Sequence, residues 1–126
     1  MVKPKARGTQ FEYRTAYLFA KYGFKWDRSR SSLGTDLKIS KNGQLRYLVS
    51  CKKTATKEII YLPREEAEKL ARESTEREAQ GLICFGFNRT PVYAIRIENL
   101  RNVESTKKSY KLSPNSGILL KDILTE

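Results

Sequence analysis

Hydrophobic periodicity divides the chain into helical and strand-like segments. Apolar residues recur every three to four positions over residues 9–22, which predicts an amphipathic helix ended by Gly23. A second helix is expected over 63–79, ended by Gly81 and mostly charged on its outer face. The continuous apolar run 82–87 predicts a buried strand. Further strands are expected over residues 24–28, 36–41, 44–52, 92–97 and 107–112. An apolar piece over 59–62 precedes the second helix, and a last amphipathic segment covers 118–124.

A hairpin between residues 34 and 52 is the best-defined of these elements. Asn42-Gly43 is the pair that best tolerates the positive φ of a tight hairpin turn. Pairing about this turn brings Asp36 and Lys52 to the same end of the two strands. Because side chains alternate along a strand, Ser50 and Lys52 share one face and Cys51 points to the other. The hairpin therefore places a carboxylate beside an amine.

Composition indicates one intracellular α/β domain. The 126 residues suit one core, so we expect a single domain over 9–126 preceded by a flexible basic arm over 1–8. The alternation of helices and strands predicts a mixed central β-sheet flanked by helices. No apolar run reaches the roughly 18 residues of a membrane helix, which predicts a soluble, cytoplasmic protein. With no histidine, triads and the usual zinc sites are excluded, and the two cysteines are expected to be reduced core thiols.

The positive charge lies in one half of the chain. Residues 1–57 contain 14 Lys and Arg against 3 acids, while residues 58–126 contain 11 of each sign. The entire net charge of +11 therefore belongs to the half that contains the hairpin. A one-sided positive field attracts a polyanion, which predicts binding of nucleic acid. A basic RNA- or ribosome-associated protein would also satisfy the charge, but it would not need Asp36 and Lys52 together at one hairpin end.

Several segments of the chain match one known family in order and spacing. They are the segments 7–12, 21–24, 28–32, 47–52 and 113–117, together with Asp36, and they extend over nearly the whole chain. In these segments the chain resembles the archaeal Holliday junction resolvases, members of the PD-(D/E)xK nuclease superfamily. The resemblance implies a restriction-endonuclease-like core, a homodimer, and Mg²⁺-dependent cleavage of two opposed strands of a four-way DNA junction, with Mn²⁺ as a substitute. It also implies roles in DNA recombination and repair at the nucleoid.

Three catalytic positions match the family by place in the sequence. Glu12 matches the family's helix glutamate, Asp36 its metal-binding aspartate and Lys52 its catalytic lysine. Ser31 and Ser32 fall where the family has a functional serine, and we assign that role to Ser32.

One position departs from the family. Ser50 stands where the family has the glutamate of its Glu-x-Lys motif. In one interpretation the protein is an inactive paralogue that binds branched DNA without cutting it. In the other, the carboxylate has moved to the following helix, as in some restriction enzymes of the superfamily. Both Glu65 and Glu66 have suitable spacing, but Glu66 shares the inward face with Leu62 and Leu70, so Glu66 is the expected substitute.

The resulting hypothesis assigns a role to each residue of the site. Asp36, Glu66 and the carbonyl oxygen of Cys51 would hold Mg²⁺, a cation that prefers oxygen ligands, and Glu12 would complete a second metal position. Lys52 would orient the attacking water or offset charge in the transition state. The residues expected to contact DNA phosphates are Lys3, Lys5, Arg7, Arg30, Ser31, Ser32 and Lys53.

Overall fold

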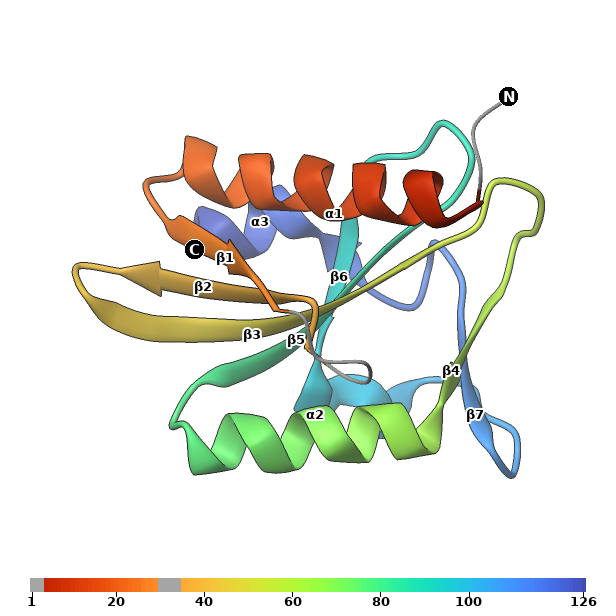
Figure 1. Cartoon of the computed structure of the whole chain (residues 1–126). Coiled ribbons are helices and arrows are strands. Elements are labelled where there is room, and N and C mark those ends of the chain that lie inside the picture. Colours follow the sequence, from red (N-terminus) through yellow and green to blue (C-terminus); the bar gives the residue numbers. More distant parts are fainter. Residues whose placement is uncertain (1–3, 30–34) are drawn as a thin grey trace.

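The protein folds around a six-stranded mixed β-sheet with helices on both faces (Figure 1). The computed structural model describes residues 4–29 and 35–126, with side chains from residue 9 onward. The strand order is β1-β2-β3-β5-β6-β8; β3 and β5 are parallel and the other neighbours are antiparallel. Strands β4 and β7 form a separate two-stranded sheet. The elements are α1 (Pro4–Lys21), β1 (Lys25–Arg28), β2 (Leu37–Lys41), β3 (Gln44–Lys53), β4 (Ile60–Pro63), α2 (Arg64–Glu76), β5 (Gln80–Gly86), β6 (Tyr93–Arg96), η1 (Ile97–Asn102), β7 (Ser109–Leu112), β8 (Ile118–Leu119) and α3 (Leu120–Leu124).

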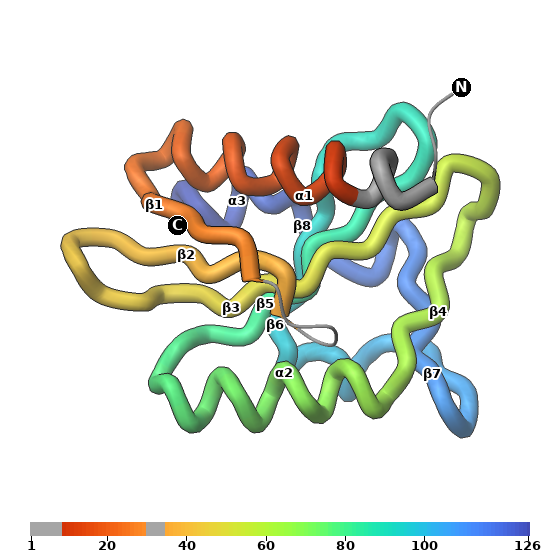
Figure 2. Tube along the Cα trace, in the orientation of Figure 1, coloured from red at the N-terminus to blue at the C-terminus, as the bar shows by residue number. Residues whose placement is uncertain are grey.

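Two hydrophobic cores lie on opposite faces of the sheet. Helices α1 and α3 cover one face, and α2 with η1 covers the other (Figures 1 and 2). Along β3 the buried Val49 belongs to the first core and Leu48 to the second. Neighbouring β5 divides in the same way, with Leu82 and Cys84 on the α1 face and Ile83 and Phe85 on the α2 face. The predicted α/β class, with a mixed sheet between helices, is confirmed.

The predicted hairpin has the expected turn and alternation. Asn42 and Gly43 both have positive φ, at 56° and 76°, and join β2 to β3. Both strands of the hairpin extend beyond the ends of α1 and α2 (Figure 2). At the opposite end of the hairpin, β2 begins at Leu37, directly after Asp36, while β3 continues to Lys53. The backbone past Val49 therefore lacks β2 as a paired neighbour, and the site is built there.

Two helix ends differ from the prediction. Helix α1 begins at Pro4, so the start predicted at residue 9 is wrong. Proline favours the first turn of a helix, and Pro4 supplies this signal before the predicted start. Helix α2 ends at Glu76, and Glu78 rather than a glycine adopts the positive φ that follows, at 54°. Gly81 lies in β5, where a Cβ would meet Ser74 Oγ at 2.8 Å, so its role is close helix-to-sheet contact.

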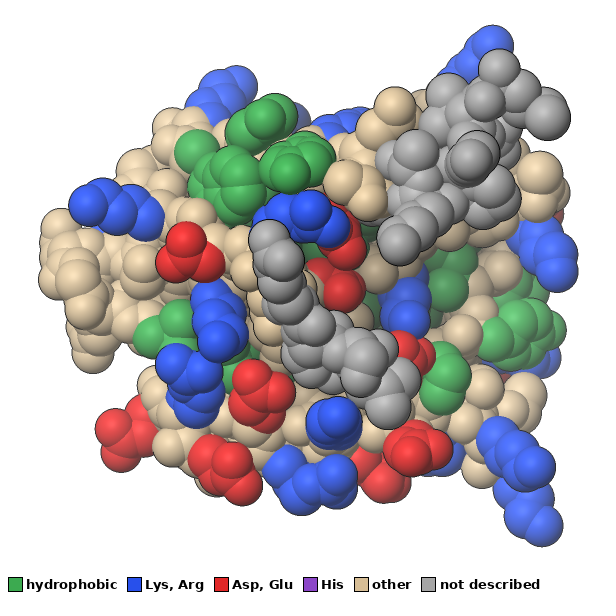
Figure 3. Space-filling view, in the orientation of Figure 1, with side chains coloured by type: hydrophobic (Ala, Val, Ile, Leu, Met, Phe, Trp, Pro, Cys, Tyr) green, Lys and Arg blue, Asp and Glu red, His purple; other side chains and the backbone are tan. Residues whose placement is uncertain are grey.

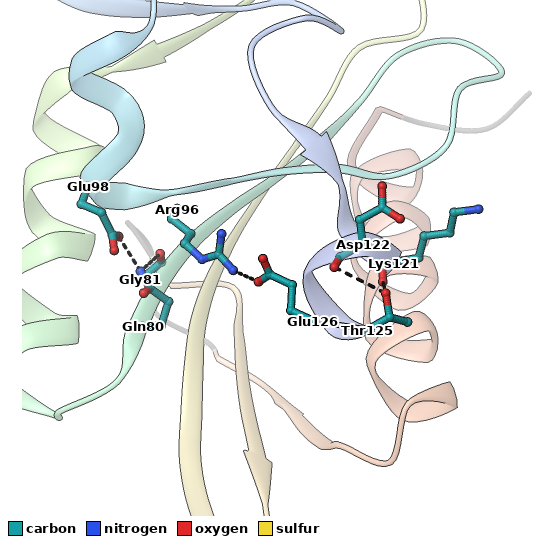
Figure 4. A network of polar contacts seen from close by, with 8 residues as sticks. All are labelled: Gln80, Gly81, Arg96, Glu98, Lys121, Asp122, Thr125 and Glu126. Atoms are coloured by element: carbon teal, nitrogen blue, oxygen red, sulfur yellow. Dashed lines mark hydrogen bonds and ion pairs between the residues drawn. The ribbon is translucent and has the colours of Figure 1, made fainter.

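Polar contacts connect β5 and β6 to η1 and to the C-terminal residue (Figure 4). Gln80, at the start of β5, donates a hydrogen bond to Glu98 of η1 at 2.7 Å, and Arg96 of β6 pairs with Glu126. Between them β5 is buried along almost its whole length, which makes it a core strand. Within the described part of the chain, no helix is long and apolar enough to cross a membrane.

Gly117 is expected to tolerate no side chain. A Cβ there would lie 2.4 Å from the carbonyl oxygen of Ala94, a backbone atom of β6. We predict that Gly117→Ala lowers the free energy of unfolding by about 1–3 kcal/mol, because β8 must move off β6. Urea unfolding measures this, with Ile118→Ala as the control, since Ile118 is 46% exposed. An unchanged urea midpoint for Gly117→Ala would contradict the prediction.

Candidate active site

Asp36 sits at the start of β2, between the two helical layers. Its backbone N–H donates to the carbonyl oxygen of Val49 at 2.7 Å, which anchors it to β3. Its carboxylate accepts a hydrogen bond from the backbone N–H of Cys51, with 2.7 Å between Cys51 N and Asp36 Oδ2. The Asp36 side chain thus takes the place of a neighbouring strand. Because the N–H and C=O of one strand residue point to the same side, the Cys51 carbonyl faces the side on which Asp36 lies.

Lys52 and Glu66 form an ion pair on the α2 face of the sheet. Lys52 Nζ lies 2.8 Å from Oε1 and 2.9 Å from Oε2 of Glu66. Both side chains are partly buried, at 27% and 19% exposure, so the contact is better shielded than a surface ion pair. Glu66 turns inward to Lys52, whereas its neighbour Glu65 is exposed. The predicted inward direction of Glu66 is therefore confirmed. The structure therefore places a carboxylate beside Lys52.

The first turn of α2 is held in place by Arg64. Its guanidinium donates to Ser105 Oγ at 2.8 Å and to the carbonyl oxygen of Thr106, and lies 4.6 Å from the centre of the Tyr110 ring. These contacts fasten the start of α2 to β7 and the segment before it. Since Glu66 follows two residues later, its position is fixed from outside the site as well as by Lys52.

Glu12 reaches the site from the opposite layer. It projects from α1 and pairs with Arg28 at the end of β1, with 2.8 Å between Arg28 Nη2 and Glu12 Oε2. The Glu12 side chain is 19% exposed, and Ala16 and Phe19 of the same helix are buried. Glu12 and Glu66 thus approach the Asp36 region from the two sides of the sheet, and each is paired with one cation.

Burial and charge disturb the ionisation of Asp36. Removal from water raises the pKa of its carboxyl above the ordinary value of 3.8. The Cys51 hydrogen bond opposes this effect, Glu12 raises the pKa further, Lys52 lowers it, and Glu66 raises it. The three neighbours are therefore close enough for their charges to act on Asp36. A partly buried carboxyl with a raised pKa, set beside a lysine and two glutamates, is typical of a functional site.

Ser50 and the two cysteines have no charge to offer the site. Ser50 is 3% exposed and lies on the α2 face, between Leu48 and Lys52. Both Cys51 and Cys84 are free, and burial raises the pKa of each thiol well above its usual value, so both remain protonated. The expectation of reduced core thiols is confirmed. The Cys51 thiol faces the α1 core, so only its backbone is available to the site.

The donors at this site are those of a hard divalent cation. Carboxylates of Asp36, Glu66 and Glu12, with the Cys51 carbonyl, form an all-oxygen set of the kind that Mg²⁺ prefers. Among the residues that the structure describes, no three His, Cys, Asp or Glu side chains already lie close enough together to hold a metal. Glu12 and Glu66 are instead turned to Arg28 and Lys52. The residue types would suit a divalent cation once a glutamate released its present partner.

The predicted DNA contacts are placed only in part. Lys53 is exposed on the α1 face, with its ammonium 5.9 Å from the centre of the Phe11 ring. Acidic and basic side chains alternate over α2 on the face shown in Figure 3. Six other residues expected to act on DNA, namely Lys3, Lys5, Arg7, Arg30, Ser31 and Ser32, lie outside the described side chains.

Arg28 is the site residue that sequence reasoning missed. It was assigned only to a strand next to a polar loop. The available signal was alternation, because Trp26 and Arg28 share the face of β1 opposite to Lys25 and Asp27. Trp26 packs against the core on the α1 face, so Arg28 points toward the same helix and meets Glu12.

Comparisons with known proteins agree with this fold. The family model of the archaeal Holliday junction resolvases matches residues 3–126. The structure is similar to Hjc, a Holliday junction resolvase from Archaeoglobus fulgidus, with a TM-score of 0.80 and 18% identity over 95% of this chain and 97% of that one. It is also similar to D212, a nuclease from a fusellovirus, with a TM-score of 0.69 and 11% identity over 98% of this chain and 92% of that one. No curated protein matches the sequence.

Proposed function

The chain belongs to the archaeal Holliday junction resolvase family, and from this premise we propose that it is an active, Mg²⁺-dependent endonuclease that cuts four-way DNA junctions as a homodimer. The observation that carries this proposal is the contact of Lys52 Nζ with both carboxylate oxygens of Glu66, at 2.8 and 2.9 Å. It supplies a carboxylate next to the lysine, although Ser50 stands where the family has its glutamate.

In this proposal each residue of the site acts through the contacts already described. Asp36, Glu66 and the Cys51 carbonyl would hold Mg²⁺, which when bound acts as a Lewis acid on the scissile phosphate and lowers the pKa of the attacking water. The Cys51 N–H orients the Asp36 carboxylate. Arg28 holds Glu12 at the α1 side of the site, where it can accept a hydrogen bond from water.

Lys52 supplies the positive charge. Its ammonium donates hydrogen bonds to a phosphate oxygen and offsets the negative charge that develops as the phosphorus becomes pentavalent. Before DNA binds, the same ammonium is held by Glu66, which keeps it from pairing elsewhere. The dimer follows from the substrate, because a four-way junction has two-fold symmetry and two opposed cuts need two sites.

The inactive-paralogue alternative rests on Ser50. A serine hydroxyl is a weak metal ligand, and every glutamate near the site already pairs with a cation. If those ion pairs never opened, the protein would bind junctions and protect them from cleavage.

Cleavage of a labelled four-way junction tests the proposal. With Mg²⁺ we expect paired cuts in two opposed strands. With EDTA we expect binding without cutting, because the cation is removed. With Ca²⁺ in place of Mg²⁺ we also expect binding without cutting, because Ca²⁺ is larger and less strictly octahedral than Mg²⁺. A linear duplex of the same sequence is the control substrate. Tight binding with no cut in either Mg²⁺ or Mn²⁺ would overturn the nuclease and support the inactive paralogue.

A further inference from the structure

Three aromatic rings form a cluster on the outside of α1 and β1. The ring centres of Tyr13 and Tyr17 are 6.0 Å apart and nearly parallel, and Trp26 meets the two rings edge-on at 5.8 and 5.9 Å. Tyr17 is 61% exposed. Hydrophobic side chains gather over the C-terminal half of α1 in the space-filling view (Figure 3). We call Tyr13, Tyr17 and Trp26 the aromatic platform.

Packing of the core accounts for Trp26, which contacts the core on the α1 face, but not for the two tyrosines of the platform. The buried residues of α1 are Phe11, Thr15, Ala16 and Phe19, which form the stripe against the sheet. Tyr13 and Tyr17 are four residues apart on a different face of the helix, which is turned toward solvent. Tyr13 is contacted by Tyr17 and by the Arg28 guanidinium, whereas Tyr17 is largely exposed. The Tyr17 ring is therefore the one suited to a flat ligand.

Arg28 joins the platform to the candidate active site. Its guanidinium lies 5.1 Å from the centre of the Tyr13 ring and donates to the Tyr13 hydroxyl at 3.5 Å. The same guanidinium donates to Glu12 through Nε and Nη2. A ligand on the platform would therefore lie next to the residues proposed to cut DNA.

On its other side, the platform borders a groove with cations around an apolar floor. The groove has a volume of about 500 Å³ and runs between α1, the segment before β6 and the start of α3. Its lining holds three cations and no carboxylate, which is complementary in charge to a polyanion. It is lined by Arg14, Tyr17, Leu18, Lys21, Pro91, Val92, Leu119 and Lys121.

We propose that the aromatic platform and this groove bind unpaired nucleotides of the DNA strand that leaves the active site. Tyr17 and its neighbours stack the bases, while Arg14, Lys21 and Lys121 contact the phosphates. A cationic groove combined with stacking rings is how proteins bind single-stranded nucleic acid without reading its sequence. The inference rests on the proposed function for its position beside the cut, but the platform would bind unpaired DNA whether or not the site cleaves.

Fluorescence of Trp26, the only tryptophan, reports binding directly. In EDTA and at one salt concentration, the protein is titrated with short oligothymidylate, with a fully paired junction and with a junction that has an unpaired gap at its branch point. We expect the oligothymidylate and the gapped junction to quench Trp26. Tyr17→Ala should weaken binding of both by about tenfold, a loss typical of one stacked base.

Two variants control for side effects. Tyr17→Phe keeps the ring and should bind within about twofold of the wild type. Tyr61→Ala removes a tyrosine of similar exposure, 54%, from β4 and should also bind normally. Equal affinities for wild type and Tyr17→Ala would overturn the proposal, as would an equal loss in Tyr61→Ala. If inorganic polyphosphate quenched Trp26 to the same extent as oligothymidylate, charge attraction alone would explain the binding. That result would also overturn the proposal.

One further outcome separates this proposal from its rivals. If Tyr17→Ala changed self-association in the absence of DNA, the platform would be an interface between copies of the chain, and the proposal would fall. Cleavage of the fully paired junction in Mg²⁺ is measured on the same variants. Loss of cleavage in the wild type would contradict the proposed function alone, because the EDTA titrations do not depend on cutting.

Discussion

Replacing Asp36 with asparagine is expected to slow junction cleavage by at least about a thousandfold, or about 4 kcal/mol in activation free energy. The change removes a charged oxygen from the proposed metal site but keeps the shape of the side chain. Asparagine Oδ1 can still accept the Cys51 N–H that now binds Asp36 Oδ2 at 2.7 Å. Junction binding in Ca²⁺ should therefore remain within about threefold of the wild type, since the basic surface is unchanged.

The same substitution is expected to stabilise the metal-free protein at neutral pH. Burial and the neighbouring glutamates raise the pKa of Asp36 in the folded state. As the pH rises, the Asp36 carboxyl therefore loses its proton at a lower pH in the unfolded chain than in the folded protein. The free energy of unfolding therefore falls as the pH rises from 3.8, the ordinary pKa of an aspartate carboxyl, to the raised pKa of Asp36. Above the raised pKa the full cost of burying the charged carboxylate is present. Asparagine never ionises and escapes this penalty.

Melting curves in EDTA at several pH values measure the effect. Asp36→Asn should melt a few degrees above the wild type at pH 7, and the gap should close below the ordinary carboxyl pKa. Asp27→Asn is the matched control, because Asp27 is exposed on β1. A variant that melts below the wild type at pH 7, or one that still cuts, would contradict the role given to Asp36.

Local patterns predicted the elements that build the site. The turn at Asn42-Gly43 and the alternation along β3 fixed the ends and faces of the hairpin, and both are confirmed. Spacing from Leu62 and Leu70 also predicted that Glu66, and not Glu65, turns inward. These features depend on backbone geometry over a few residues, so one sequence contains enough information to place them.

Features that depend on distant partners were less predictable. The start of α1 was predicted at residue 9 but lies at Pro4. A glycine was expected to end α2, but Glu78 adopts the positive φ that follows the helix. The pairing of Glu12 with Arg28 links two elements whose contact is set by tertiary packing. Likewise, spacing alone predicted Glu66 near the site but not its direct bond to Lys52. The role of each residue in catalysis remains a prediction for experiment.

Glu66 is expected to be essential for cleavage, and a glutamate at position 50 should replace it. Glu66→Gln should lower cleavage by about a hundredfold, whereas Glu65→Gln, at an exposed neighbour, should leave it nearly unchanged. Both substitutions remove one negative charge from the first turn of α2. A difference between their cleavage rates therefore depends on the position of the carboxylate and not on the helix dipole.

Restoring the family's glutamate tests the exchange of carboxylates directly. Ser50 and Lys52 share the α2 face of β3, so a glutamate at position 50 would approach Lys52 from within the strand. In the Glu66→Gln background, Ser50→Glu should recover at least about tenfold of the lost cleavage rate. In the wild-type background, the same change should lower stability, because a second carboxylate enters a position that is 3% exposed. Single-turnover cleavage and melting curves are measured for the double variant. Recovery of cleavage would show that the carboxylates at positions 50 and 66 act in the same site. If the double variant is folded, binds junctions and cuts no faster than Glu66→Gln, Glu66 does not act in place of the glutamate missing at position 50.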